Sequence, residues 1–311
     1  MNIFTIIMPL ILVALLGFTC AKSQWLSRAQ IDALSKFTFY LSIPAFLFYQ
    51  MAKANFSEEI SPQLFTAFYL PVLSCYAIAW LCHYFLINKK NTKANTFSAV
   101  FSLAASYSNT VIIGLPVLLA ALGEQVLGII FLIITFHSAL LFALTSALAS
   151  LNTDTKQTFS AKAIVKQNLK NPLVVSISLG LLVNLLGIEL PKVFAESLML
   201  IGKPAITLAL FILGASLAYY QVRDKLFAIF IASFCKLILL PALVLFVSQV
   251  IFQLSPMSTA VLVILSACPT GVNAYLIAKS HQQEQQTVAG TVVVTTLLSM
   301  FTIPLWLSFF L

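Results

Sequence analysis

Charged residues are scarce in this chain of 311 residues. They make up 8% of it, with nine Asp and Glu against seventeen Lys and Arg, whereas soluble domains contain roughly 25%. The surface of a soluble globule of this size needs far more charge. The composition therefore excludes a soluble enzyme and a nucleic-acid-binding domain. Because apolar residues make up 60% of the chain, we predict an all-α polytopic protein whose surroundings are the lipid bilayer.

Several chemical motifs are also missing. All nine acidic residues lie in connections or at the ends of apolar runs, so the sequence offers no buried carboxylate site for a cation. It contains no HExxH motif, no phosphate-binding GxxxxGK[ST] motif and no Ser/His/Asp set within its apolar runs. The five cysteines are not spaced as metal ligands or as a disulfide framework. These absences argue against an enzyme, a bound metal and a cofactor.

Ten apolar runs are predicted to cross a bilayer as helices, and the sixth is the shortest of them. Because every backbone polar group must be satisfied within a crossing segment, the runs are predicted to be helices. They lie at 3–20, 34–51, 64–86, 96–122, 126–148, 172–186, 197–217, 226–252, 257–278 and 288–310.

Basic residues alternate along the connections between these runs. Thirteen of the seventeen Lys and Arg fall in the odd-numbered connections, which the positive-inside rule places in the cytoplasm. An even number of spans then puts both termini outside, in the periplasm of a bacterial inner (plasma) membrane. The long basic connection at 150–171 is predicted to be a cytoplasmic linker between a five-helix repeat at 1–149 and a second one at 172–311.

Prolines and glycines recur in the same order in the two halves. Pro9 and Gly17 correspond to Pro172 and Gly180 at an offset of 163 residues, and two further proline pairs have offsets of 160 and 170. Asn109 corresponds to Asn273 at an offset of 164. A repeat with an odd number of spans enters the membrane from the opposite side the second time. The halves are therefore predicted to be inverted, an architecture typical of secondary transporters.

Two apolar runs carry polar stretches near their centres. Residues 106–116 read SYSNTVIIGLP and residues 266–274 read SACPTGVNA. Unwound backbone persists in a membrane only where it lines a cavity, and the restarted half-helices would point partial positive charge at an anion. The candidate substrate-binding residues are Asn109, Thr110, Gly114, Pro116, Pro269, Thr270, Gly271 and Asn273. The alternative is a pair of ordinary proline kinks whose Asn and Thr side chains cap neighbouring helix ends.

Two further ionisable residues lie inside apolar runs. His137 is either a satisfied hydrogen-bonding group or a proton-coupling group. Lys236 either extends toward the membrane surface, pairs with carbonyl groups or helps to hold an anion. Both are candidate coupling or auxiliary residues.

The stretches 109–116, 210–218 and 269–274, followed by Ala278-Lys279, resemble the auxin efflux carrier family. This family includes PIN-type plant auxin carriers and bacterial permeases labelled malonate or malate transporters. The resemblance covers nearly the whole chain but not the long central loop of the plant carriers. It implies a fold similar to that of bile-acid and sodium/proton transporters, with a scaffold of spans 1, 2, 6 and 7. It also implies that spans 4 and 9 cross at Pro116 and Pro269, and that the carrier is a homodimer with elevator-like motion.

The leading functional prediction is a secondary transporter of small organic anions, either auxin-like or malonate/malate-like mono- or dicarboxylates, working by alternating access. One alternative is a sodium- or proton-coupled symporter of a neutral or steroid-like solute. A different class of protein, a membrane sensor or scaffold without transport, is the other alternative.

Overall fold

The computed structural model describes residues 3–53, 61–87, 94–150, 172–219 and 225–310. Within these ranges the regular secondary structure is helical, apart from one isolated antiparallel bridge between Ser108 and Thr270. The prediction of an all-helical, multi-pass membrane protein is confirmed. Apart from Ser150, which ends α7, the predicted linker at 150–171 lies outside the described residues.

Among the described residues, six helical segments are long and apolar enough to cross a membrane. They are α2 (Arg28–Phe37) with η1 (Thr38–Ser42) and α3 (Ile43–Lys53); α4 (Pro62–Cys82) with η2 (His83–Ile87); η4 (Glu124–Val126) with α7 (Leu127–Ser150); α10 (Lys192–Gly202) with α11 (Ala205–Leu217); α12 (Leu226–Phe234) with η5 (Cys235–Leu239), α13 (Leu240–Phe246) and η6 (Val247–Ile251); and α16 (Gln285–Leu307). The other helices are α1 (Ile3–Lys22), α5 (Ala94–Ser106), η3 (Thr110–Gly114), α6 (Leu115–Leu122), α9 (Pro172–Leu185), α14 (Pro256–Ala267) and α15 (Asn273–His281).

Three of the π-helical turns have a common cause in the sequence. The turns η1, η3 and η5 each end two residues before a proline, at Pro44, Pro116 and Pro241 respectively. A proline ring clashes with the carbonyl four residues earlier and provides no N–H donor. One extra residue per turn relieves that clash without ending the helix. These prolines therefore widen their helices, and the breaks in the helices occur elsewhere.

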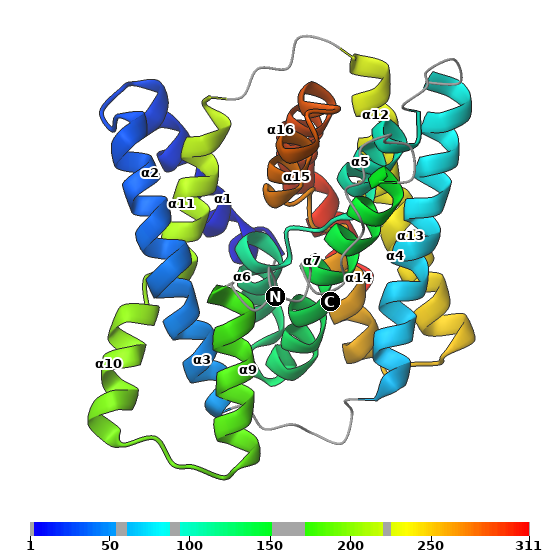
Figure 1. Cartoon of the computed structure of the whole chain (residues 1–311). Coiled ribbons are helices and arrows are strands. Elements are labelled where there is room, and N and C mark those ends of the chain that lie inside the picture. The colour runs from blue at the N-terminus through cyan, green and yellow to red at the C-terminus, as the bar shows by residue number, and fades with distance from the viewer. Residues whose placement is uncertain (1–2, 54–60, 88–93, 151–171, 220–224, 311) are drawn as a thin grey trace.

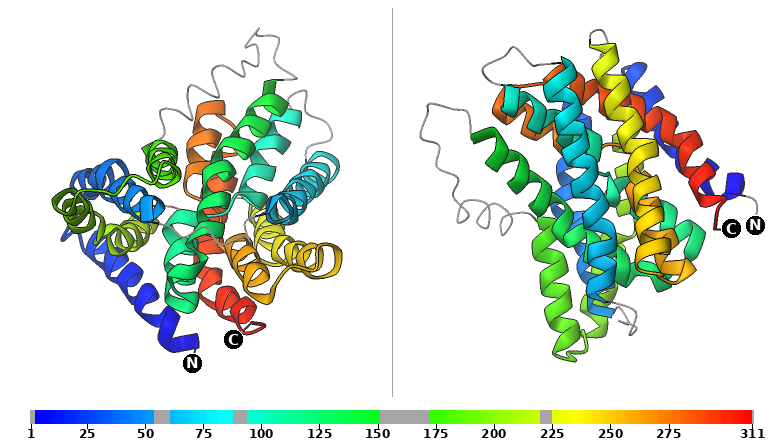
Figure 2. Two further views of the ribbon diagram at one scale, coloured as in Figure 1. Left: turned by 90° about the horizontal axis from the view of Figure 1, so that it is seen from below. Right: turned by 90° about the vertical axis from the view of Figure 1, so that its right-hand side faces the viewer.

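The helices form two groups that lie side by side (Figures 1 and 2). We call α1, α2, η1, α3, α9, α10 and α11 the panel, and all the other helices the core bundle. In the panel, α1 packs on α11, and α3 packs on α9 and α10. In the core bundle, α4 packs on α5 and α13, while α12 and α14 pack on α16. The helices α1 and α3 also contact α6 and α7 of the core bundle, so the two groups share a seam.

Glycines permit the two closest helix crossings in the panel. A Cβ atom on Gly17 of α1 would lie 1.9 Å from the carbonyl oxygen of Phe211 in α11. A Cβ atom on Gly180 of α9 would lie 2.7 Å from the carbonyl oxygen of Phe48 in α3. Small residues of this kind let membrane helices approach closely. One offset of 163 residues relates the two contacts, because it takes Gly17 to Gly180 and Phe48 to Phe211.

We predict that Gly17→Leu destabilises the protein. The new side chain would force α1 away from α11, and overpacking of this kind costs about 1–3 kcal/mol. The apparent melting temperature of the purified protein in detergent should fall by several degrees. Leu16→Ala is the matched control, because Leu16 is the preceding residue and is 58% exposed. Equal melting temperatures for the two variants would contradict the close crossing.

Candidate functional site

Two helices are interrupted at the centre of the core bundle. The helix α5 ends at Ser106 and the next helical turn, η3, begins at Thr110. The helix α14 ends at Ala267 and α15 begins at Asn273. The second interruption follows from Pro269, because a residue that precedes proline is biased toward extended backbone, and Cys268 has φ −58° and ψ 147°.

The two interruptions are joined to each other by backbone hydrogen bonds. The N–H of Asn109 donates to the carbonyl of Pro269 at 2.8 Å, and the N–H of Gly271 donates to the carbonyl of Tyr107 at 3.0 Å. These reciprocal bonds form the antiparallel bridge at Ser108 and Thr270. We call this arrangement the crossing. It satisfies backbone groups that neither broken helix can satisfy alone.

Hydroxyl groups extend the crossing to the ends of the two helices. The Thr270 Oγ1 donates to the carbonyl of Ala104 in α5 at 2.7 Å, and the Ser108 Oγ donates to the carbonyl of Ser266 in α14 at 3.4 Å. A single offset of 162 residues converts each of these bonds into the other, because Ser108 becomes Thr270 and Ala104 becomes Ser266. The same offset exchanges the two backbone bonds of the crossing.

The two auxiliary residues predicted from the sequence both support the crossing. His137 Nε2 of α7 accepts the N–H of Ser108 at 2.9 Å, and its ring is stacked on Tyr107 with the ring centroids 5.1 Å apart. Lys236 is fully buried, and its ammonium donates to the carbonyl of Ser266. A cation at this point complements the partial negative charge at the C-terminus of α14.

A small cavity of about 30 Å³ lies against the crossing, and we call it the crossing cavity. Four of the eight predicted binding residues line it: Asn109, Thr110, Gly271 and Asn273. The other four have different places. Pro269 and Thr270 take part in the hydrogen bonds of the crossing, Gly114 faces Leu265 and Cys268, and Pro116 lies inside α6. The crossing is thus at Pro269 on one helix but at 107–109, ahead of Pro116, on the other.

Asn109 lines this cavity, and only one end of its amide has a hydrogen-bond partner among the described residues. Its Oδ1 accepts the N–H of Ile112 at 3.4 Å, which caps η3. This bond fixes the orientation of the amide, because the opposite orientation would direct an N–H group at another N–H group. The amide nitrogen Nδ2 is buried and has no hydrogen-bond partner within the described part of the chain. An unpaired buried donor costs about 1–3 kcal/mol, so this position favours a ligand with an acceptor oxygen.

Sequence reasoning missed other residues of the cavity. The hydroxyls of Tyr107 and Ser138 are 2.8 Å apart, both residues line the cavity, and Tyr107 also interacts with Asn273. A Cβ atom on Gly271 would lie 2.3 Å from the Tyr107 ring, so the glycine provides the space for that ring. The panel contributes Phe39 and apolar residues of α9. Tyr107 lies within the polar stretch noted in the sequence, but no pattern indicated the residues of the panel.

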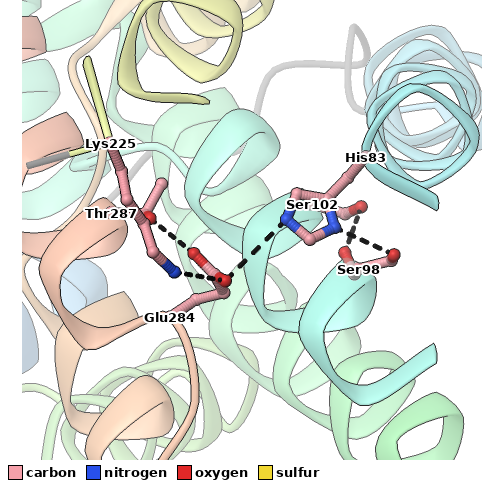
Figure 3. A network of polar contacts seen from close by, with 6 residues as sticks. All are labelled: His83, Ser98, Ser102, Lys225, Glu284 and Thr287. Carbon is pink, nitrogen blue, oxygen red and sulfur yellow. Dashed lines mark hydrogen bonds and ion pairs between the residues drawn. The ribbon is translucent and has the colours of Figure 1, made fainter. Parts of the chain in front are cut away.

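A second polar cluster joins η2 and α5 to the starts of α12 and α16 (Figure 3). Glu284 Oε1 accepts a hydrogen bond from Lys225 Nζ at 2.8 Å and lies 3.9 Å from His83 Nε2, and its Oε2 accepts the hydroxyl of Thr287. His83 Nδ1 is 3.0 Å from Ser98 Oγ. Lys225 and Glu284 both have positive φ, at 58° and 49°, and each immediately precedes a helix. The ion pair therefore ties the starts of α12 and α16 together, although the two residues belong to connections far apart in the sequence.

Apolar helices around paired interruptions define a helical membrane protein, and comparison with known proteins places it among transporters. The sequence profile of the membrane transport protein family matches residues 2–307, so the chain belongs to that family. The resemblance to auxin efflux carriers is thereby confirmed, and the family consists of transporters and not of enzymes.

Three relatives match along nearly their whole length. "Uncharacterized transporter YfdV" of Escherichia coli (strain K12) is 26% identical over 97% of this chain and 95% of its own. "Putative malonate transporter" of Rhizobium meliloti (strain 1021) is 24% identical over 96% of this chain and 92% of its own. "Uncharacterized transporter MJ1031" of Methanocaldococcus jannaschii is 23% identical over 97% and 96%.

We predict that Thr270→Val destabilises the crossing. The substitution keeps the shape of the side chain but leaves the buried carbonyl of Ala104 without its hydroxyl donor, which should cost about 1–3 kcal/mol. Thr66→Val is the matched control, because the Thr66 hydroxyl also donates to a carbonyl, that of Pro62, but on an exposed surface. Thermal unfolding in detergent should show a clear drop for the first variant and little change for the second. A larger fall in melting temperature for Thr66→Val than for Thr270→Val would contradict a stabilising role of the Thr270 hydroxyl at the crossing.

Proposed function

We propose that this protein is a secondary transporter of small organic anions, with mono- or dicarboxylates as substrates. The observation that carries the proposal is that Asn109, which lines the crossing cavity, has a buried amide nitrogen with no partner among the residues that the structure describes. A carboxylate oxygen is a strong acceptor for such a donor. The malonate name of the Rhizobium meliloti relative supports the same substrate class.

Neutral donors around the cavity fit a carboxylate. Tyr107, Ser138 and Asn273 bring hydroxyl and amide groups to it. The half-helix α15 begins at Asn273, where its N-terminal dipole end favours negative charge. The cavity lining contains no acidic residue among those the structure describes. An anion would thus find donors and no opposing charge.

The size of the cavity supports a transport cycle in which the two groups of helices move. A volume of about 30 Å³ is close to that of one water molecule and too small for a dicarboxylate. The panel residues Phe39, Leu173 and Ile177 line its other side. We propose that displacement of the core bundle along the panel opens the cavity to alternate faces, in an elevator-type cycle.

An inverted repeat supports alternating access. We propose ten spans in two inverted halves, 1–149 and 172–311, with α5–α6 and α14–α15 as the interrupted fourth and ninth spans. An offset of 162 residues relates the hydrogen bonds of the crossing, and an offset of 163 relates the glycine contacts in the panel. Two equivalent halves provide two equivalent packings, one open to each side.

We predict that Asn109→Asp abolishes most transport without unfolding the protein. The aspartate keeps an oxygen to cap Ile112 but removes the amide donor and adds a negative charge facing the substrate. Loss of a hydrogen bond to a charged group is worth about 1.5–3 kcal/mol, so flux should fall at least about ten-fold. Counterflow of radiolabelled malonate in proteoliposomes measures the effect, with Thr66→Val as the control. Wild-type flux in Asn109→Asp would remove Asn109 from the substrate site.

Sidedness provides a separate prediction. The charge pattern puts the connection after α1 in the cytoplasm and the connection between α9 and α10 outside. In intact cells a membrane-impermeant maleimide should therefore label Glu189→Cys and spare Ser23→Cys, and both should react after permeabilisation. Both positions are exposed. Labelling of Ser23→Cys in intact cells would invert the proposed orientation.

A further inference from the structure

A cavity of about 760 Å³ lies between the panel and the core bundle, separate from the crossing cavity. Its polar lining comprises Tyr49, Gln50, Lys53, Glu124, Gln125 and Lys203. The volume is within the range of small-molecule sites, roughly 300–1,000 Å³. It lies at the face that the charge pattern predicts to be outside.

This cavity gathers positive charge at a face that is otherwise acidic in sequence. Lys53 ends α3 and Lys203 caps the C-terminus of α10. Neither takes part in the ion pairs found among the described residues. By contrast, Lys192 at the same face is paired with Glu196 at 4.0 Å, and both are exposed. Glu124 is the one acidic residue of the described lining, so two cations oppose one anion.

The same helices line this cavity and the crossing cavity. Helix α7 contributes Gly128 to the larger cavity and Ile134 to the crossing cavity, and six residues of helix correspond to about 9 Å. On the panel, Tyr49 lines the larger cavity and Phe39 the crossing cavity. The two cavities therefore follow one seam. Buried apolar side chains of α7, such as Phe131, lie between these positions.

We propose that the Lys53–Lys203 cavity is the outer vestibule of the carrier, which concentrates a small organic anion by charge before it reaches the crossing. The substrate part of this inference rests on the proposed function. Two cations in a cleft with low-dielectric walls attract anions, and the attraction falls as salt rises. The vestibule thus sets the apparent affinity at the outer face.

The charge of the vestibule can be tested without any substrate. A cysteine in place of Gln125 is modified with an anionic and a cationic methanethiosulfonate reagent, and the protein with native Gln125 provides the background. The ratio of anionic to cationic rates should fall at least about three-fold in Lys53→Gln/Lys203→Gln, rise in Glu124→Gln, and stay unchanged in Lys192→Gln. These differences should shrink in 0.5 M salt as the screening length shortens to a few ångströms, on the order of 4 Å. An unchanged ratio in the double variant would overturn the vestibule.

Radiolabelled malonate then tests whether the vestibule serves transport. The KM measured from the outer face should rise about three- to ten-fold in Lys53→Gln/Lys203→Gln at low salt, while the maximal rate and the KM from the inner face stay unchanged. A lowered labelling ratio with an unchanged outer KM would overturn the role in substrate capture. If the wild-type protein moves no malonate from either face, the substrate of the proposed function is wrong, and the labelling ratio still decides whether the cavity concentrates anions.

Discussion

The reciprocal backbone hydrogen bonds between residues 107–109 and 269–271 are the constraint on which the centre of this protein depends. A membrane interior supplies no water to unpaired N–H and C=O groups, so one interrupted helix alone would leave them unsatisfied. Here the N–H of Asn109 and the N–H of Gly271 each find a carbonyl on the other interruption. The helix breaks are therefore mutually dependent. A change that straightens one of them also removes the partners of the other.

The crossing cavity lies where the two halves differ. With the offset of 162 residues, the backbone bonds and the hydroxyl caps are equivalent, but Asn109 corresponds to Gly271 and Tyr107 corresponds to Pro269. At these two positions the large polar side chains come from the first half, while Asn273 lines the cavity from the second half. The glycine of the other half leaves room for the Tyr107 ring. The equivalent hydrogen bonds make the crossing symmetric. The residues that differ between the two halves place hydrogen-bond donors on one side of it.

Hydropathy and proline patterns predicted the helical membrane fold and both polar interruptions, because these depend on local chemistry. They did not predict which residues of the two interruptions lie opposite each other. The sequence suggested that Asn109 corresponds to Asn273, whereas the hydrogen bonds pair Ser108 with Thr270, since backbone geometry and not side-chain identity sets the bridge. The sequence also gave no indication that Phe39 would cover the crossing cavity or that Glu284 would be buried against Lys225. Such contacts join residues that are distant along the chain.

The distribution of polar contacts suggests how the two groups of helices could move. The panel is joined by hydrogen bonds such as that from Ser42 to the carbonyl of Ile201, and the core bundle by those of Thr270, Lys236 and Glu284. The crossing cavity, in contrast, is covered from the panel by apolar side chains. Apolar contacts are non-directional, so one such surface can slide along another without leaving a donor unpaired. This distribution supports the proposed cycle, in which the core bundle, with the crossing inside it, moves along the panel.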